Sequence, residues 1–152
     1  MFTLANLSFG VGSLLLTVQG EWRLASLMVL GSLVADGLDG RLARWLKSDG
    51  PFGRELDSLA DVVSFGVAPA VLLHQMMLHE LGLAGLAVTL LFPLCGALRL
   101  ARFNIVSTSG YFMGVPITAA GTLLSTMAFY LLQESTTNPP PAVIPTVMVL
   151  LS

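Results

Sequence analysis

Hydrophobic residues form long runs in this chain, and short polar segments separate them. The five longest runs lie at residues 3–20, 24–47, 53–79, 82–105 and 116–133. Runs of about 20 apolar residues are long enough to cross a bilayer as helices. A last run, 142–152, has only eleven residues, so it is either truncated or does not cross. The pattern predicts an all-α polytopic membrane bundle of about six transmembrane helices.

The composition agrees with a membrane protein built as one domain over residues 1–152. Of the 152 residues, 55% are hydrophobic and only 11% are charged, which is typical of chains that reside in a bilayer. Seven Lys and Arg stand against nine Asp and Glu. Without a basic excess, the chain is not expected to bind nucleic acid.

Four aspartates, Asp36, Asp39, Asp57 and Asp61, interrupt or border the second and third apolar runs. An ionised aspartate in the middle of a membrane costs about 2.5 to 3.5 kcal/mol on insertion scales, so such residues are rare and usually functional. Four of them close together in sequence need a physical reason.

The spacing of these aspartates indicates that they share a site. Asp36 and Asp39 are three residues apart, and Gly53, Asp57 and Asp61 follow one another at steps of four, so each group lies along one helix face. If the two helices are antiparallel neighbours, the four carboxylates converge. Divalent cations would relieve their repulsion, and hard oxygen ligands suit Mg²⁺, Mn²⁺ or Ca²⁺. Two metal ions about 3.5 to 4 Å apart recur in enzymes that displace groups at phosphorus.

The cationic residues are distributed unevenly over the predicted loops. Only Arg23 falls on one side of the bundle. The other side has Arg41, Arg44, Lys47, Arg54, Arg99 and Arg102. Because Lys and Arg mark cytoplasmic loops, we expect an integral protein of the cytoplasmic membrane whose acidic cluster faces the cytoplasm.

The stretch from Asp36 to Asp61 resembles the complete signature of the CDP-alcohol phosphotransferases, membrane enzymes that move a phosphatidyl or similar group from a CDP-linked donor to an alcohol. All eight fixed positions are present at the required spacing: Asp36, Asp39, Gly40, Ala43, Arg44, Gly53, Asp57 and Asp61. The segments 56–70, 95–104 and 111–120 are similar to the bacterial and archaeal serine-specific members, the phosphatidylserine synthases. This resemblance implies transfer of a phosphatidyl group from CDP-diacylglycerol to L-serine, with release of CMP, by a homodimer.

The resemblance also implies roles for individual residues. Asp36, Asp39, Asp57 and Asp61 would hold two divalent ions, Mg²⁺ or Mn²⁺, with Ca²⁺ as a structural substitute, and Asp61 would also be the catalytic base for the acceptor hydroxyl. The CDP moiety and its phosphates would contact Asp39, Gly40, Ala43, Arg44 and Gly53. An alternative for the small residues is that they serve only helix packing.

A second cationic group follows the fourth apolar run. Arg99, Arg102 and Asn104 lie close together in sequence, and we expect them to bind the acceptor or the lipid phosphate. The alternative is that the arginines only determine topology. Two other functions stay open: the same chemistry with glycerol phosphate or inositol phosphate as acceptor, and a non-catalytic cation transporter.

Overall fold

The computed structural model describes residues 2–46, 51–105, 116–133 and 148–149. In this part of the chain the backbone is helical, with short turns and no strand. The α-helices are α1 (Phe2–Val18), α2 (Trp22–Leu46), α3 (Pro51–Asp61), α4 (Ala68–Met76), α5 (Leu83–Ile105) and α6 (Ile117–Gln133). A π-helix, η1 (Val62–Val67), joins α3 to α4, and a 3₁₀-helix, η2 (Leu78–Leu81), precedes α5.

The prediction of an all-helical chain is confirmed for these residues. Two helical stretches are long and apolar enough to cross a membrane, Phe52–Met76 and Leu83–Arg102, whereas the apolar helices at Thr3–Val18 and Ile117–Gln133 are shorter. Most of the predicted last run, 142–152, lies outside the described residues. The six-span topology therefore stays a prediction.

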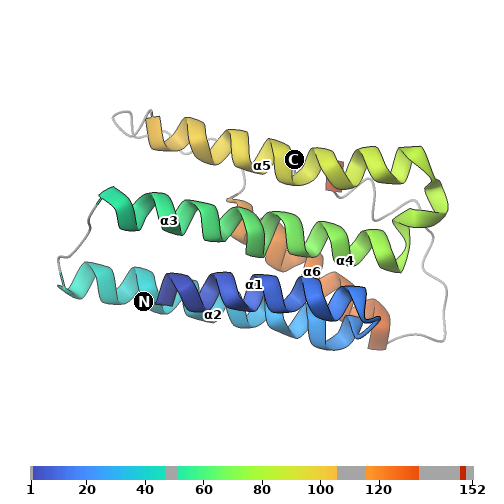
Figure 1. Cartoon of the computed structure of the whole chain (residues 1–152), viewed down its shortest axis with the longest axis horizontal. Helices are drawn as coiled ribbons and strands as arrows, with labels where there is room; N and C mark the ends of the chain where they lie inside the picture. Colours follow the sequence, from blue (N-terminus) through green and yellow to red (C-terminus); the bar gives the residue numbers. More distant parts are fainter. Residues whose placement is uncertain (1, 47–50, 106–115, 134–147, 150–152) are drawn as a thin grey trace.

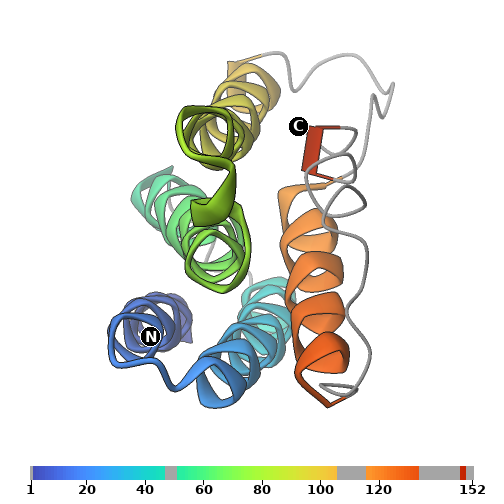
Figure 2. The same ribbon diagram turned by 90° about the vertical axis from the view of Figure 1, so that its right-hand side faces the viewer.

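The helices run roughly along one axis, with α6 crossing the others obliquely (Figures 1 and 2). α1 and α2 form an antiparallel pair that packs on one side of the continuous α3–η1–α4 rod, and α5 returns along the other side (Figure 1). Since α2 runs opposite to α3, the end of α2, the start of α3 and the end of α5 lie at the same end of the bundle. This is the arrangement that the aspartate spacing requires.

The π-helix lies directly after Asp61. Pro69 has no amide hydrogen to donate to the carbonyl of Phe65, four residues earlier, and the amide of Ala68 bonds instead to the carbonyl of Val63, five residues earlier. On α6, Gly121 lies against the carbonyl oxygen of Phe65, and a Cβ there would overlap with it. Widened turns of this kind occur frequently at functional sites.

Candidate metal centre

Three of the four predicted aspartates meet between α2 and α3. One carboxylate oxygen from each of Asp36, Asp57 and Asp61 lies within 4.8 Å of the other two. Asp57 and Asp61 are one turn apart on α3, and Asp36 lies in the second half of the antiparallel helix α2. Asp61 is only 9% exposed, and the other two are half-buried. The structure thus concentrates acidic oxygens at the partly enclosed junction of two helices.

Asn6 of α1 completes the surroundings of Asp61. Its side-chain Nδ2 donates a hydrogen bond to Oδ1 of Asp61 at 3.1 Å. Its backbone carbonyl accepts hydrogen bonds from the hydroxyls of Ser64, at 3.0 Å, and Ser32, at 3.3 Å. Asn6, Ser32 and Ser64 are all fully buried. These bonds connect α1 to both helices that carry the aspartates.

A glycine allows α1 to come close enough for these contacts. Gly10 lies one turn after Asn6, and a Cβ at this position would overlap with the side chain of Ser64. A larger residue would push α1 away from η1, and the Ser64 hydroxyl would then not reach the Asn6 carbonyl. Gly10 therefore supports the position of Asn6 beside Asp61.

The three carboxylates have the composition and spacing of a divalent cation site. Two oxygens bound to one Mg²⁺ lie at most about 4.2 Å apart, and two bound to one Ca²⁺ lie at most about 5 Å apart. Oxygens within 4.8 Å of one another match this range after small side-chain rotations. A donor set made only of carboxylates suits a hard cation, and a cation would offset the repulsion among three neighbouring negative charges. The residues present therefore fit a divalent metal ion.

Several predicted residues have side chains outside the described part of the structure. The backbones of Asp39, Gly40, Ala43 and Arg44 belong to α2, and that of Asn104 belongs to α5. Asp39 follows Asp36 by one helical turn. Its metal role, and the nucleotide and acceptor roles of the others, stay predictions.

Gly53 lies in α3, one turn before Asp57. It is exposed, and a Cβ at this position would meet no described atom within 4 Å. No described residue therefore requires glycine here for packing. This observation weakens the alternative that Gly53 serves only helix packing.

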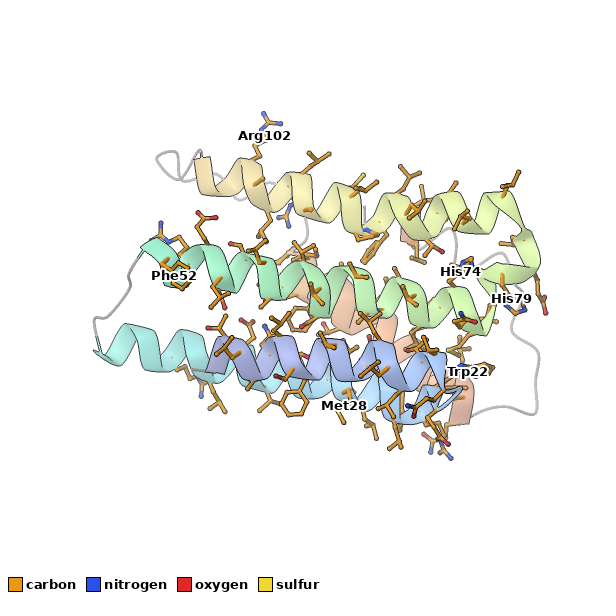
Figure 3. The ribbon with its side chains drawn as sticks, viewed as in Figure 1. Trp22, Met28, Phe52, His74, His79 and Arg102 are labelled. Carbon is orange, nitrogen blue, oxygen red and sulfur yellow. The ribbon has the colours of Figure 1, made fainter. Side chains whose placement is uncertain are left out.

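The two predicted arginines of α5 differ in their surroundings. Arg99 is half-buried, whereas Arg102 is exposed, and its side chain points away from the neighbouring helices (Figure 3). Arg99 is therefore the better placed of the two for contact with a ligand held among the helices.

The histidines lie far from the aspartates. His74, His79 and Trp22 occupy one end of the bundle, and Phe52, near the start of α3, marks the other (Figure 3). Nδ1 of His74 lies 3.0 Å from the hydroxyl of Thr89. The two histidines therefore lie toward the end of the bundle opposite to the start of α3.

The sequence interpretation missed Asn6. A single amide in an apolar run has no spacing relationship to residues on distant helices, and its contact with Asp61 joins positions 55 residues apart. The only signal in the sequence was a strongly polar side chain within an otherwise apolar first helix.

A family model described as CDP-alcohol phosphatidyltransferase matches residues 1–151 of the chain. Among curated proteins, a CDP-diacylglycerol–serine O-phosphatidyltransferase of Helicobacter pylori is 42% identical over 127 residues, which cover 82% of this chain and 54% of the relative. A protein of the same name from Bacillus subtilis is 36% identical over 130 residues, covering 85% of this chain and 73% of the relative.

An archaetidylserine synthase of Methanothermobacter thermautotrophicus is 38% identical over 135 residues, which cover 86% of this chain and 56% of the relative. The chain thus spans about half the length of the Helicobacter and Methanothermobacter relatives that it matches. The names of these relatives specify different lipids, and all three names include serine.

Proposed function

The chain belongs to the CDP-alcohol phosphatidyltransferase family, and on this basis we propose that it transfers a phosphatidyl group from CDP-diacylglycerol to L-serine. The observation that supports the proposal most strongly is that one carboxylate oxygen from each of Asp36, Asp57 and Asp61 lies within 4.8 Å of the other two. The agreement of the relatives' names on serine supports the choice of acceptor.

The metal ligands in this proposal are Asp36, Asp57 and Asp61, joined by Asp39 from the next turn of α2. Mg²⁺ or Mn²⁺ bound there would offset the negative charge of a diphosphate and of the departing CMP. The chain supplies oxygens from two antiparallel helices, so each helix fixes one side of the site. The carboxylates need no large rearrangement to act together.

Asp61 is proposed to accept the proton of the serine hydroxyl. As the hydroxyl oxygen bonds to the lipid-linked phosphorus, the bond from that phosphorus to the oxygen of CMP breaks, and CMP leaves with the electron pair. A carboxylate positioned for this transfer contributes a factor of about 10² to 10⁴ to the rate. The buried position of Asp61 and its bond from Asn6 hold the carboxyl in place.

The open surface at Gly53 is proposed to receive the nucleotide. A residue without a side chain lets a ligand approach the helix backbone closely, and Gly53 has no described neighbour that would fill this space. Arg44, Gly40 and Ala43 would complete this surface from α2. Arg99 would bind an anionic group of the acceptor or the lipid.

The positions of the arginines support a proposed orientation in the membrane. Arg41, Arg54 and Arg102 are exposed and lie in or near the ends of α2, α3 and α5 that meet at one end of the bundle (Figure 1). Arg23 lies at the start of α2, at the other end. We call the end of the bundle toward which Asp36, Asp57 and Asp61 lie the acidic end. By the positive-inside rule, we propose that the acidic end faces the cytoplasm, where free serine is available.

Two further features belong to the same proposal. We propose that residues 1–152 act as one membrane domain, which the family match over residues 1–151 supports. A homodimer, which the family resemblance implies, is proposed as its assembly.

Release of CMP tests the proposal directly. The purified protein is reconstituted in vesicles that contain CDP-diacylglycerol and Mg²⁺, and CMP is measured after addition of L-serine, glycerol phosphate or inositol phosphate. We expect release with serine, loss of release on chelation of Mg²⁺, and a decrease of about 10² to 10⁴-fold in Asp61→Asn. The Asp61→Asn protein should keep its helical circular dichroism.

Two results would contradict the proposal in different ways. Release of CMP with a phosphorylated acceptor but not with serine would overturn the choice of acceptor and leave the chemistry standing. Metal flux across the vesicles without CMP release from any acceptor would overturn the enzymatic function altogether.

A further inference from the structure

Of the two polar atoms in the side chain of Asn6, one contacts the acidic site. Nδ2 donates to Asp61 at 3.1 Å, whereas Oδ1 has no hydrogen-bond partner among the residues that the structure describes. The residue is 0% exposed. Unpartnered buried polar atoms are uncommon in folded proteins, and each one needs an explanation.

A role in tying the helices together does not explain this side chain. The hydroxyls of Ser32 and Ser64 bond to the backbone carbonyl of Asn6, which any residue at this position would provide. An apolar side chain of similar size would fill the same space without leaving a polar atom unsatisfied. Among the described residues, the side-chain amide therefore has one polar contact, the carboxyl of Asp61.

We propose that Asn6 is a positioning residue for Asp61, and that its amide fixes the orientation in which this carboxyl joins Asp36 and Asp57 around a divalent cation. The inference depends on the proposed function for the role of Asp61. A carboxylate that binds a metal has two oxygens and rotates about its last bond, so a donor held on one oxygen restricts the direction of the other. Asn6 is well suited to this task because α1 is fixed to both neighbouring helices by the bonds to its backbone.

Ser13 provides a matched control on the same helix. It is fully buried, and its hydroxyl also lacks a hydrogen-bond partner in the described part of the chain. Seven residues separate it from Asn6, so it lies on the same helix face two turns farther from the acidic end. A general effect of removing a buried polar group from α1 should appear equally in both variants.

The test measures Mn²⁺ affinity by electron paramagnetic resonance in the full chain, because this readout does not depend on turnover. Partners that hydrogen-bond a metal ligand typically change affinity by about 10 to 100-fold when removed. We expect Asn6→Ala to raise the Kd for Mn²⁺ by about this factor, and Ser13→Ala to leave it unchanged. Asn6→Leu, which keeps more of the original volume, should behave like Asn6→Ala.

A double-mutant cycle separates positioning from a general structural effect. In the Asp61→Asn background, Asn6→Ala should weaken Mn²⁺ binding by less than about twofold further, because the group that it orients is already changed. The proposal would be overturned if Asn6→Ala raised the Kd for Mn²⁺ by the same factor in both backgrounds. An unchanged Kd in Asn6→Ala, or an equal loss in Ser13→Ala, would also overturn it.

The outcome is independent of the acceptor assay. Coupling between Asn6 and Asp61 without serine-dependent CMP release would reject the proposed function and keep the positioning role. Serine-dependent CMP release without coupling would reject the positioning role alone.

Discussion

Polar side chains have different surroundings at the two ends of the helix bundle. At the histidine end, the hydroxyl of Thr89 donates to the carbonyl of Gly85 at 2.8 Å. Its single hydrogen is then used, so Nδ1 of His74 donates to the Thr89 oxygen at 3.0 Å. At the acidic end, Asp36, Asp57 and Asp61 gather like charges within 4.8 Å.

This difference indicates which end is organised for a ligand. Polar groups that serve folding satisfy one another, as His74 and Thr89 do. Polar groups that serve binding keep charge or hydrogen-bonding capacity that only a further group uses. The clustered negative charge of Asp36, Asp57 and Asp61 supports the proposal that the acidic end binds the ligand.

A substitution at Gly53 should produce a larger effect on turnover than a substitution at the histidine end. Its Cβ would meet no described atom within 4 Å, and alanine favours a helix more than glycine does, so Gly53→Ala should not lower the melting temperature. If a nucleotide occupies the open space, the added methyl group should raise the KM for CDP-diacylglycerol by about tenfold, the equivalent of about 1.4 kcal/mol. The measurement is CMP release at varied donor concentration.

Gly37 of α2 is the control for this test. It is also exposed and open, with no described atom within 4 Å of the added Cβ. Gly37→Ala should leave the KM for the donor unchanged. Equal KM values for Gly53→Ala and the unsubstituted protein would remove Gly53 from the nucleotide surface.

The smallest effect is expected at the histidine end. Thr89→Val keeps the shape of the side chain but removes the partner of His74, which should lower the free energy of unfolding by about 1 kcal/mol. Thermal unfolding in detergent measures this change. CMP release below the unfolding temperature should stay at its original rate, and a large loss of turnover would show that the division between the two ends is wrong.

The sequence predicted the helices because long apolar runs leave few alternatives to a helix in a bilayer. It also predicted the meeting of Asp36 with Asp57 and Asp61, because steps of three and four residues define a helix face. Their roles as ligands and base stay predictions. These features depend on local periodicity, which a sequence displays directly.

Other features of the site depend on contacts between distant segments. The hydrogen bond from Asn6 to Asp61 requires knowledge of how α1 packs on α3, which periodicity does not give. The π-helix at Val62–Val67 was also missed. A proline such as Pro69 shows in the sequence that an amide hydrogen is missing, but a kinked helix and a widened turn can both accommodate this loss.

Mn²⁺ titration of the purified chain measures directly whether the three aspartates bind a divalent ion. Electron paramagnetic resonance gives the stoichiometry and affinity in the unsubstituted protein and in Asp36→Asn/Asp57→Asn, which keeps the shape of both side chains. We expect Mn²⁺ to bind to the unsubstituted protein and this binding to be lost in the double variant. Equal Mn²⁺ binding in both proteins would show that Asp36 and Asp57 do not form the metal site.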